Sequence, residues 1–549
     1  MGVSAEQRVS AEIAREICER YNLKAFIVGS IAPLGSHYVI TLEAANGHTG
    51  EALARELVEA ESRERVLWAL SEAVTRLRRR LGESLSSIRR FDKPLVQATT
   101  SNLEAFKAWT LGMERSHSGN VMEAIVFYKR AVELDPDFAH AYGVLAVVHG
   151  ATGRPGLAAD YAQKAYALRD RVSEYEKLDI INFYHGFVTG DLNKQIEVLT
   201  LLKQMLPRDN FAATNLALTY NELGQSDRAV AEAREAVRVT PHFAPAHWAL
   251  AWSLLSQDRF AEAKDVIAQA FEQKLDLPGF HSVLYQIAFI QSDRAGMQRH
   301  FDWTRGRPDE YLALDWQPSA KAFAGEWRDA KGLARRAIEL GAARDDTKEV
   351  AARLATEQAL RSAVFGDCGE ALEDAGAGLK LVRGRASLPR AALALALCSE
   401  PSQAKQLVDE LTQLYPEDTL INSIWIPEIR ATIELRAGNA ARAVEQLQTA
   451  TRYEAGAEFW PQYLRGQAYL ELGRGEEAAA EYQKILDHRG QAALSPLYPL
   501  AHLGLARAGS RTNDAALRRR AWEDFLAAWK DADRDLPILI EAKREYEMR

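Results

Sequence analysis

Cysteine is scarce in this sequence, whose 549 residues include three: Cys18, Cys368 and Cys398. No two of them form a CxxC pair, and an odd, widely spaced set indicates neither a zinc knuckle nor a disulfide framework. The start, MGVSAEQRVS, is polar and lacks the apolar core of a signal peptide. Runs of about 18 apolar residues are absent as well, so we expect no transmembrane segment.

Sequence motifs that carry chemistry are also missing. There is no HExxH, no GxxxxGK[ST] and no GxSxG, and none of the 12 histidines lies near a cysteine at metal-ligand spacing. Asp531, Asp533 and Asp535 mimic the opening of a calcium loop. However, Leu536 stands where that loop needs glycine and Ala542 where it needs a bidentate glutamate. We therefore expect no catalytic residues, no metal and no cofactor.

The charge balance gives no general attraction for nucleic acid. There are 68 basic and 76 acidic residues, a formal net charge of −8. One basic stretch stands out, made of Arg76, Arg78, Arg79, Arg80, Arg89 and Arg90. It has no interleaved aromatic residues, so a solvated helix face is favoured over a nucleic-acid patch. Binding to nucleic acid is unlikely on this pattern.

What the sequence does contain is a repeat with a period near 34 residues. Hydrophobic residues make up 47% and charged residues 26%, which is ordinary globular usage and argues against disorder. Leu111-Gly112 is followed by Ala124, Tyr128, Ala131 and Pro136. Small residues let two helices cross closely, a large residue fills the gap beside them, and proline ends the second helix. The pattern is that of a tetratricopeptide unit.

The small residue near the start of the second helix marks each repeat. Its successive gaps lie between 32 and 41 residues and cluster on 34. The markers are Ala124, Ala158, Gln195, Ala229, Ala263, Ala295, Ala330, Ala371, Ala404, Ala443, Ala478 and Arg518. Gln195 and Arg518 break the small-residue rule and mark the two weakest repeats. Turn signals fall between paired helices at Gly119, Gly153, Gly190, Gly224, Gly438 and Gly473.

A different pattern precedes the array. Residues 4–21 predict an amphipathic helix, and 24–30 and 37–45 predict strands separated by a Pro-Leu-Gly-Ser turn. Residues 51–59 can form a third strand, and 66–81 predict a second helix. The sequence therefore predicts a small α/β domain of order α-β-β-β-α over residues 1–97. A mostly α tetratricopeptide solenoid follows over 98–549, as a right-handed superhelix of about ten to twelve helical pairs.

These residues resemble a known family. The array is similar to the tetratricopeptide region behind the kinase domain of certain bacterial serine/threonine protein kinases of acidobacterial type. The passages that carry this are residues 14–53 and 81–105, FVTGDLNKQ (187–195), LYPEDT (414–419), YQKILDHRG (482–490) and residues 529–547. The first unit also resembles part of the amino-terminal domain of the TolB translocation protein. No kinase motif occurs, so the resemblance implies a sensor or docking part, or a free-standing relative.

The resemblance bears on cysteine pairing and on compartment. It implies a cysteine at the place of Gly47, able to pair with the equivalent of Cys18. Because glycine stands there in this chain, neither that disulfide nor an oxidising compartment is supported. Without a leader or spanning segment we expect a cytoplasmic chain, or an extracytoplasmic one if it is a fragment of a membrane kinase.

Aromatic residues supply the candidate binding site. In a stacked array the first helix of each pair lines a concave face. Counting from the markers places these residues on that face or one position from it: Trp109, Trp248, Trp252, Trp425, Trp460 and Tyr463. Exposed rings there can anchor a peptide or a partner helix. Taken singly, each ring also fits ordinary packing of the repeat. Asn215 stands alone, without the Lys/Asn series that captures a C-terminal carboxylate.

The sequence thus predicts a scaffold that is not an enzyme. Its partners are expected to be proteins or peptides, in bacterial signalling linked to a serine/threonine kinase. Two alternatives stay open: a nucleic-acid or transcription-regulatory accessory protein, and a self-assembling architectural subunit. The first alternative predicts affinity that falls steeply with salt, and the second predicts a mass that rises with concentration.

Overall fold

The computed structural model describes residues 10–20, 23–83, 100–207 and 209–547. It divides into two compact units. The first holds Met1–Gly112, Val126–Val144 and Lys164–Ile180, and the second holds Met113–Ile125, Leu145–Gln163 and Ile181–Arg549. The predicted domain boundary at 97/98, with Arg89 and Arg90, lies outside the described residues, so the division into domains stays a prediction.

The chain begins with the α-β-β-β-α order that the sequence predicts. The elements are α1 (Ala11–Arg20), β1 (Ala25–Leu34), β2 (His37–Asn46), β3 (Ala52–Ala60) and α2 (Val66–Arg80). The strands form one antiparallel sheet in the order β1-β2-β3. Gly35 turns between β1 and β2 with φ +64°, a conformation that glycine adopts at little cost.

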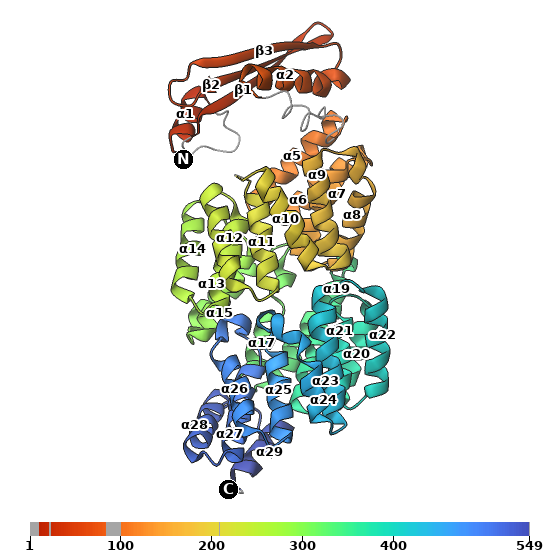
Figure 1. Ribbon diagram of the computed structural model, residues 1–549, viewed down its shortest axis with the longest axis vertical. Coiled ribbons are helices and arrows are strands. Elements are labelled where there is room, and N and C mark those ends of the chain that lie inside the picture. Colours follow the sequence, from red (N-terminus) through yellow and green to blue (C-terminus); the bar gives the residue numbers. More distant parts are fainter. Residues whose placement is uncertain (1–9, 21–22, 84–99, 208, 548–549) are drawn as a thin grey trace. The chain divides into compact units, whose positions relative to one another are not determined.

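One face of this sheet is covered only in part. Helix α2 packs on β2 and β3, where Ile40, Val58 and Leu77 are buried in a shared core (Figure 1). Strand β1 pairs with β2 alone among the described strands, and eight of its ten residues are exposed. Ile27 is 62% exposed and Ile31 is 53% exposed. The edge of the sheet is therefore long, apolar and uncharged.

Position 47 adjoins the thiol of Cys18. Cys18 is buried, and a Cβ added to Gly47 would stand 3.1 Å from its sulfur. The same Cβ would stand 2.4 Å from the Leu23 carbonyl oxygen. The two positions that the kinase-array resemblance pairs are therefore neighbours here. Cys18 is a free cysteine, and Gly47 supplies no second thiol to pair with it.

Helices make up the rest of the described chain. The first twelve are α5 (Leu103–His117), α6 (Val121–Leu134), α7 (Ala139–Ala151), α8 (Pro155–Ala167), α9 (Glu174–Phe183), α10 (Leu192–Met205), α11 (Asn210–Glu222), α12 (Ser226–Val239), α13 (Ala244–Ser256), α14 (Phe260–Glu272), α15 (Pro278–Ile290) and α16 (Arg294–Thr304). The next are α17 (Trp316–Phe323), α18 (Trp327–Ala342), α19 (Lys348–Phe365), α20 (Cys368–Leu381), α21 (Leu388–Leu397), α22 (Pro401–Leu414), α23 (Ile426–Arg436), α24 (Ala440–Gln446), α25 (Trp460–Glu471), α26 (Gly475–Leu486), α27 (Leu497–Arg511), α28 (Ala515–Ala528) and α29 (Pro537–Glu547). Single π-helical turns extend α9 (Tyr184–Thr189) and precede α23 (Ile421–Trp425).

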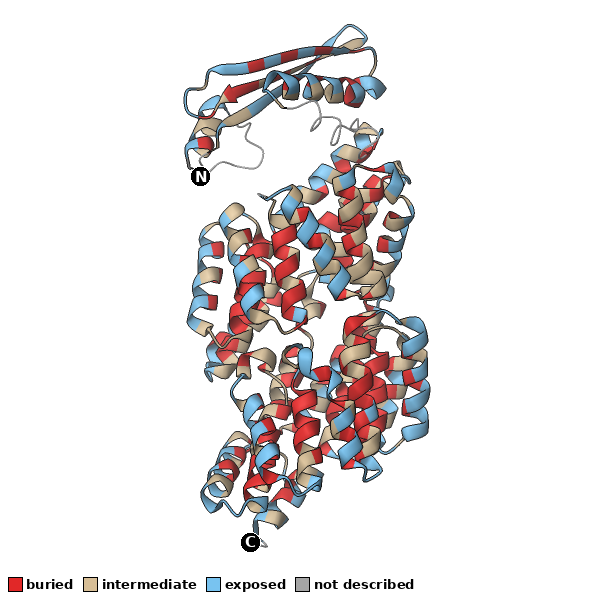
Figure 2. Cartoon of the chain, in the orientation of Figure 1, coloured by how far each residue is buried: buried red, intermediate tan, exposed pale blue. Residues whose placement is uncertain are grey.

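From α5 to α28 these helices follow one another as twelve pairs, each with a first and a second helix. The first helices are more deeply buried (Figure 2). All residues of α21 except Arg390 are buried, whereas its partner α22 buries Ala404, Leu407, Val408 and Leu411. In the second unit, for example, α13 contacts its partner α14 and also α11, α12 and α15 of the neighbouring pairs. The solenoid that the sequence predicts is confirmed.

The small-residue markers sit where helices cross. Nine of the alanine markers are buried, but Ala295 is exposed and Gly296 takes its place in the core. That marker was wrong by one residue, because α16 begins at Arg294, after its N-cap Asp293. In the two weak repeats the small residue lies on the facing helix. A Cβ on Gly186 would meet the Gln195 amide at 2.7 Å.

The second unit coils back on itself. The Gly190 carbonyl accepts a hydrogen bond from the Thr419 amide at 3.0 Å. The Lys194 ammonium binds Glu417 at 2.8 Å, and Asp258 accepts from the Gly490 amide at 2.7 Å. The last two contacts join residues 223 and 232 positions apart, which is about seven repeats of 34 residues. Successive coils of the array therefore touch through their turns.

Candidate functional site

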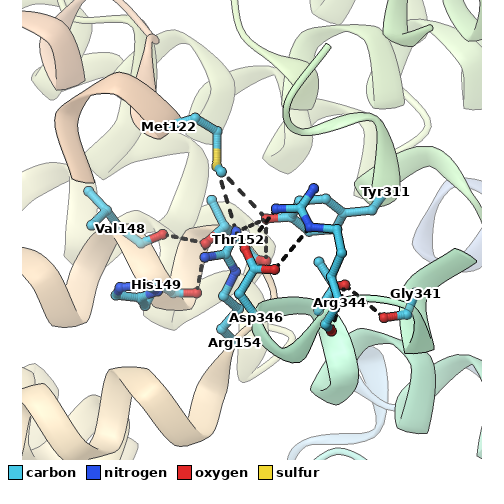
Figure 3. Close-up of polar contacts among 10 residues, drawn as sticks. Met122, Val148, His149, Thr152, Arg154, Tyr311, Gly341, Arg344 and Asp346 are labelled. Atoms are coloured by element: carbon cyan, nitrogen blue, oxygen red, sulfur yellow. Dashed lines mark hydrogen bonds and ion pairs between the residues drawn. The ribbon is translucent and has the colours of Figure 1, made fainter. Parts of the chain in front are cut away.

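One buried polar network belongs to these contacts between coils (Figure 3). Arg154, in the turn between α7 and α8, is 3% exposed and donates to the Tyr311 hydroxyl at 2.8 Å. Tyr311 donates in turn to the Thr152 carbonyl at 3.2 Å, and Asp346 lies 3.6 Å from the Arg154 guanidinium. Burial opposes the charge of Asp346, but hydrogen bonding to Arg344 and the charge of Arg154 lower its pKa. The network holds the turn between α7 and α8 in place.

A separate polar cavity lies where first helices converge. Its volume is about 260 Å³. Its walls come from α15, α17, α19 and α21, from the start of α25 and from residues 491–497, which lead into α27. Six charged residues line it: Asp315, Arg353, Glu357, Arg361, Arg390 and Glu458. A first-helix surface this rich in charge is the strongest candidate for a binding site among the described residues.

Two of these residues form a tight ion pair. Arg361, 5% exposed, donates from both guanidinium nitrogens to the Asp315 carboxylate at 3.0 and 2.9 Å. The same guanidinium donates to the Ser319 hydroxyl at 2.8 Å. Burial opposes ionisation of Asp315, but the charge and hydrogen bonds of Arg361, together with the Arg353 charge and the Ser319 hydroxyl, lower the Asp315 pKa. This bidentate pair joins the start of α17 to α19, and each of the two charges is compensated by the other.

Arg390 is held in a second arrangement. Its guanidinium donates to Glu357 at 2.8 Å and to the Ala386 carbonyl at 2.9 Å. It also lies over the Trp425 ring, 5.0 Å from the centroid. Cation–π contact of this kind is favourable where water is excluded. Arg390 therefore has three partners, and its nearest oxygen on Glu458 is 4.0 Å away.

Arg353 and Glu458 are the least satisfied charges of the cavity. Arg353 is half-buried, and its guanidinium forms no hydrogen bond or ion pair with any described residue, although its charge contributes to lowering the Asp315 pKa. Glu458 is 53% exposed in its side chain and has φ +49°, a left-handed conformation that is rare outside glycine. Phe459 follows with φ +74° and is 1% exposed, which fixes this turn.

The structure separates the six aromatic residues predicted for a groove. Trp460 lines the polar cavity but is 7% exposed, and Tyr463 is 6% exposed with its ring 6.3 Å from that of Trp460. Trp425 reaches the same region beneath Arg390. Both Trp460 and Tyr463 belong to the hydrophobic core, so most of their ring surface is already packed.

The other three lie elsewhere. Trp248 and Trp252 are half-buried and stack with centroids 5.6 Å apart, against the core of α13 to α15. Trp109, in the first unit, is half-buried against Phe138 and His140. No comparison or contact tests partner binding by these rings, so the groove assignment stays a prediction.

Two charged features of the sequence have internal partners. Asp533 accepts from the Arg328 amide at 2.7 Å, and Asp535 binds the Arg328 guanidinium at 2.6 Å. The acidic turn thus holds the start of α18. In the basic stretch, Arg80 binds Glu56 at 2.7 Å and Arg76 binds Glu72. These pairings support a solvated helix face.

Cys368 and Cys398 form a disulfide, contrary to our expectation from the sequence. Cys368 begins α20 and Cys398 follows α21. Consecutive antiparallel helices bring the start of one beside the end of the next, so a spacing of 30 residues closes the bridge. Wide spacing in the sequence is therefore no argument against pairing in a helical repeat.

Sequence reasoning missed the charged cavity. Its signal was present on α19, where Arg353, Glu357 and Arg361 recur at intervals of four on one face of a helix that is otherwise largely buried. Charged residues on a first helix need partners or a ligand, because they face the concave side.

No helix in residues 10–20, 23–83, 100–207 or 209–547 has the length and apolar character to cross a bilayer. In the same ranges, no group of three or more His, Cys, Asp or Glu side chains is arranged to hold a metal ion.

Comparisons with known proteins bear on the fold. Among solved structures, the chain is similar to PilW, described as a widely conserved type IV pilus biogenesis factor, at 17% identity and a TM-score of 0.26. The likeness covers 39% of this chain and 99% of that one, and at this TM-score it carries no argument. No curated protein matches the chain. The tetratricopeptide repeat family model matches residues 110–171, 214–273 and 430–493. The chain therefore carries tetratricopeptide repeats, the repeat of a protein-interaction scaffold, within a helical solenoid that follows a small α/β unit.

Proposed function

We propose that this protein is a non-catalytic scaffold that binds protein or peptide partners on the first helices of its array. The observation that carries the proposal is the convergence of α15, α17, α19, α21 and α25 on one polar cavity. In arrays of this kind the first helices form the extended concave binding surface. The half-buried rings of Trp248 and Trp252 add apolar contact area on another first helix, α13.

The finer part of the proposal concerns the pathway. We propose a role in bacterial signalling linked to a serine/threonine kinase, with residues 1–97 as a partial TolB-like domain and 98–549 as the array. Support comes from the resemblance of six passages to the arrays of bacterial kinases. The adjacency of Cys18 and position 47 is in keeping with that resemblance, which pairs the same two positions.

Affinity capture with matched variants tests this function. Lysate of the source organism is passed over wild type, over Trp248→Ala/Trp252→Ala and over the control Trp303→Ala. Trp303 is a half-buried tryptophan on a second helix, α16, where it stacks on His281 at 3.7 Å. We expect wild type and control to capture the same proteins and the double variant to lose them.

Two further outcomes decide the proposal. Equal capture by all three folded proteins would show that the first-helix aromatic residues do not bind partners. A serine/threonine kinase, or a substrate of one, among the captured proteins supports the finer proposal, and a set without either contradicts it. Thermal melting of each variant separates lost binding from lost folding.

A second candidate function is self-assembly, favoured by the exposed edge of β1. The strand Ala25–Leu34 carries no charge, although exposed edge strands usually carry charges that block pairing with another chain. A second copy pairing along β1 would cover Ile27 and Ile31. Sedimentation over a range of concentrations then gives a rising mass for wild type and for the control Leu414→Lys, an exposed position on α22. Ile27→Lys/Ile31→Lys stays monomeric. A constant monomer mass for wild type rules this candidate out.

A further inference from the structure

The polar cavity has an unusual charge balance. Its three arginines, Arg353, Arg361 and Arg390, face three carboxylates, so the lining has no net charge when all are ionised. Two of the arginines are already engaged with Asp315 and Glu357. The Arg353 guanidinium has no partner among the described residues, and the Glu458 carboxylate has only the long contact to Arg390 at 4.0 Å.

Charge balance selects the class of ligand. A phosphate or another dianion would meet the Arg353 guanidinium but also three carboxylates nearby. A simple cation would meet Glu458 but also three guanidinium groups. A ligand that carries one positive and one negative group would give close partners to Arg353 and to Glu458, whose contact with Arg390 is long, and would leave the cavity neutral.

The size of the cavity limits the ligand further. A volume of about 260 Å³ equals roughly eight or nine water molecules at about 30 Å³ each. One small molecule of a few non-hydrogen atoms fills that space, whereas a nucleotide or a helix does not. The amide side chains of Gln286 and Gln491 also line it and can donate or accept hydrogen bonds.

The backbone holds the carboxylate at the cavity. Glu458 and Phe459 are consecutive non-glycine residues with positive φ, and burial of the Phe459 ring keeps the turn in that shape. Residues held in such conformations cluster at ligand sites. Arg353 comes from the long helix α19, most of whose residues are buried.

We propose that this cavity binds a free α-amino acid, with its carboxylate on the Arg353 guanidinium and its ammonium on the Glu458 carboxylate. The proposal goes beyond partner binding and does not depend on it. A chain that binds no protein can still bind the amino acid, and a chain that binds no amino acid can still bind a protein.

Calorimetry and thermal melting of the full chain test the site. The probe is first an equimolar mixture of the twenty common amino acids, then each amino acid alone. We expect at least one to bind wild type and to raise its melting temperature. The N-acetyl and the amide derivatives of that amino acid lack the ammonium and the carboxylate charge respectively. Each should bind on the order of 10–100-fold more weakly, the range for a lost charged hydrogen bond.

Two variants assign the charges. Arg353→Gln and Glu458→Gln should each weaken the amino acid on the order of 10–100-fold. Arg442→Gln, at an exposed arginine on α24, should not change its binding. Glu458→Gln should not weaken the N-acetyl derivative further, because the group it binds is already missing. That lack of additivity is not expected of a structural defect.

Three results overturn the proposal. One is that no amino acid stabilises folded wild type at several millimolar. Another is that the N-acetyl derivative binds as tightly as its parent. The third is that both variants bind like wild type. If a peptide binds here and no free amino acid does, the cavity serves partner recognition and the amino-acid site is rejected. The capture experiment with Trp248→Ala/Trp252→Ala is unaffected by any of these results.

Discussion

The carboxylate of Glu349, on α19, caps the start of α8, 193 residues earlier in the chain. It accepts hydrogen bonds from the backbone amides of Gly156 at 2.6 Å and Leu157 at 3.3 Å. These amides have no partner within their own helix, and a negative charge at a helix start is favourable. One side chain therefore couples a turn of one coil of the array to the next.

Removing this carboxylate should loosen the contact between coils. Glu349→Ala is expected to destabilise the contact between α19 and the start of α8 by about 1 kcal/mol, the typical value of a lost helix cap. Hydrogen exchange of the α7–α8 turn is the measurement, and the amides of Gly156 and Leu157 should exchange faster. Unchanged exchange there, with wild-type melting, would show that the cap contributes nothing to coil packing.

Glycine positions between coils give a sharper test. A Cβ on Gly490 would stand 1.9 Å from the Leu255 carbonyl oxygen, so Gly490→Ala must move the backbone. We expect a loss of about 1–3 kcal/mol, typical of overpacking. The matched control is Gly376→Ala on α20, where an added Cβ meets nothing within 4 Å.

The control variant Gly376→Ala should stabilise the chain, whereas Gly490→Ala should destabilise it. Alanine in a helix interior is favoured over glycine by about 0.8–1 kcal/mol, so Gly376→Ala should raise the melting temperature. Urea denaturation of both variants decides the point. Equal stability of the two would contradict the close packing of the Gly490 turn on α13.

The disulfide should support α20 and α21. For a closed loop of 30 residues the loss on opening is about 3–4 kcal/mol by the chain-entropy estimate. Cys398→Ser should lower the melting temperature, and reductant should lower that of wild type but not of the variant. If reductant leaves wild type unchanged, the bridge is either not formed or not stabilising.

Glu428 should make stability depend on pH. It lies on α23, it is 1% exposed, and neither carboxylate oxygen has a hydrogen-bond partner among the described residues. Burial raises its pKa well above the usual range, with the charge of Glu458 adding to the effect. The folded chain therefore keeps a proton that the unfolded chain releases above about pH 4.3, and stability falls as pH rises.

Glu428→Gln removes that dependence. The change in the free energy of unfolding caused by Glu428→Gln should favour the variant more and more as the pH rises above about 4. The change should grow by up to about 1.4 kcal/mol per pH unit. Melting curves from pH 4 to pH 8 measure the difference. A constant difference between the two proteins across that range would mean that Glu428 is ionised in the folded chain.

Much of the fold could be predicted from the sequence because each repeat places particular residue types at fixed local spacings. The order α-β-β-β-α and nine of the ten alanine markers follow from local side-chain patterns and turn residues. The weak repeats show where this ends. At Gln195 the small residue had moved to Gly186 on the facing helix, and at Arg518 it had moved to Gly509. Close packing depends on both helix surfaces at a crossing. A rule about one position therefore misses repeats in which the small residue lies on the facing helix.

The candidate site was less predictable for the same physical reason. Arg361 and Asp315 lie 46 residues apart, and Glu458 comes from a still more distant turn. Their convergence depends on how the first helices stack, which no local pattern encodes. The aromatic residues chosen from the repeat register were partly core, as Trp460 and Tyr463 show.

Hydrogen exchange of the chain with a captured partner tests the central claim most directly, because it reports which helices a partner covers. If partners bind the first helices, protection should appear in α13, α15, α19, α21 and α25, while the second helices α14, α20 and α26 exchange as in the free chain. Protection confined to the second helices, or to the described residues before position 84, would contradict the account and move the binding surface away from the first helices.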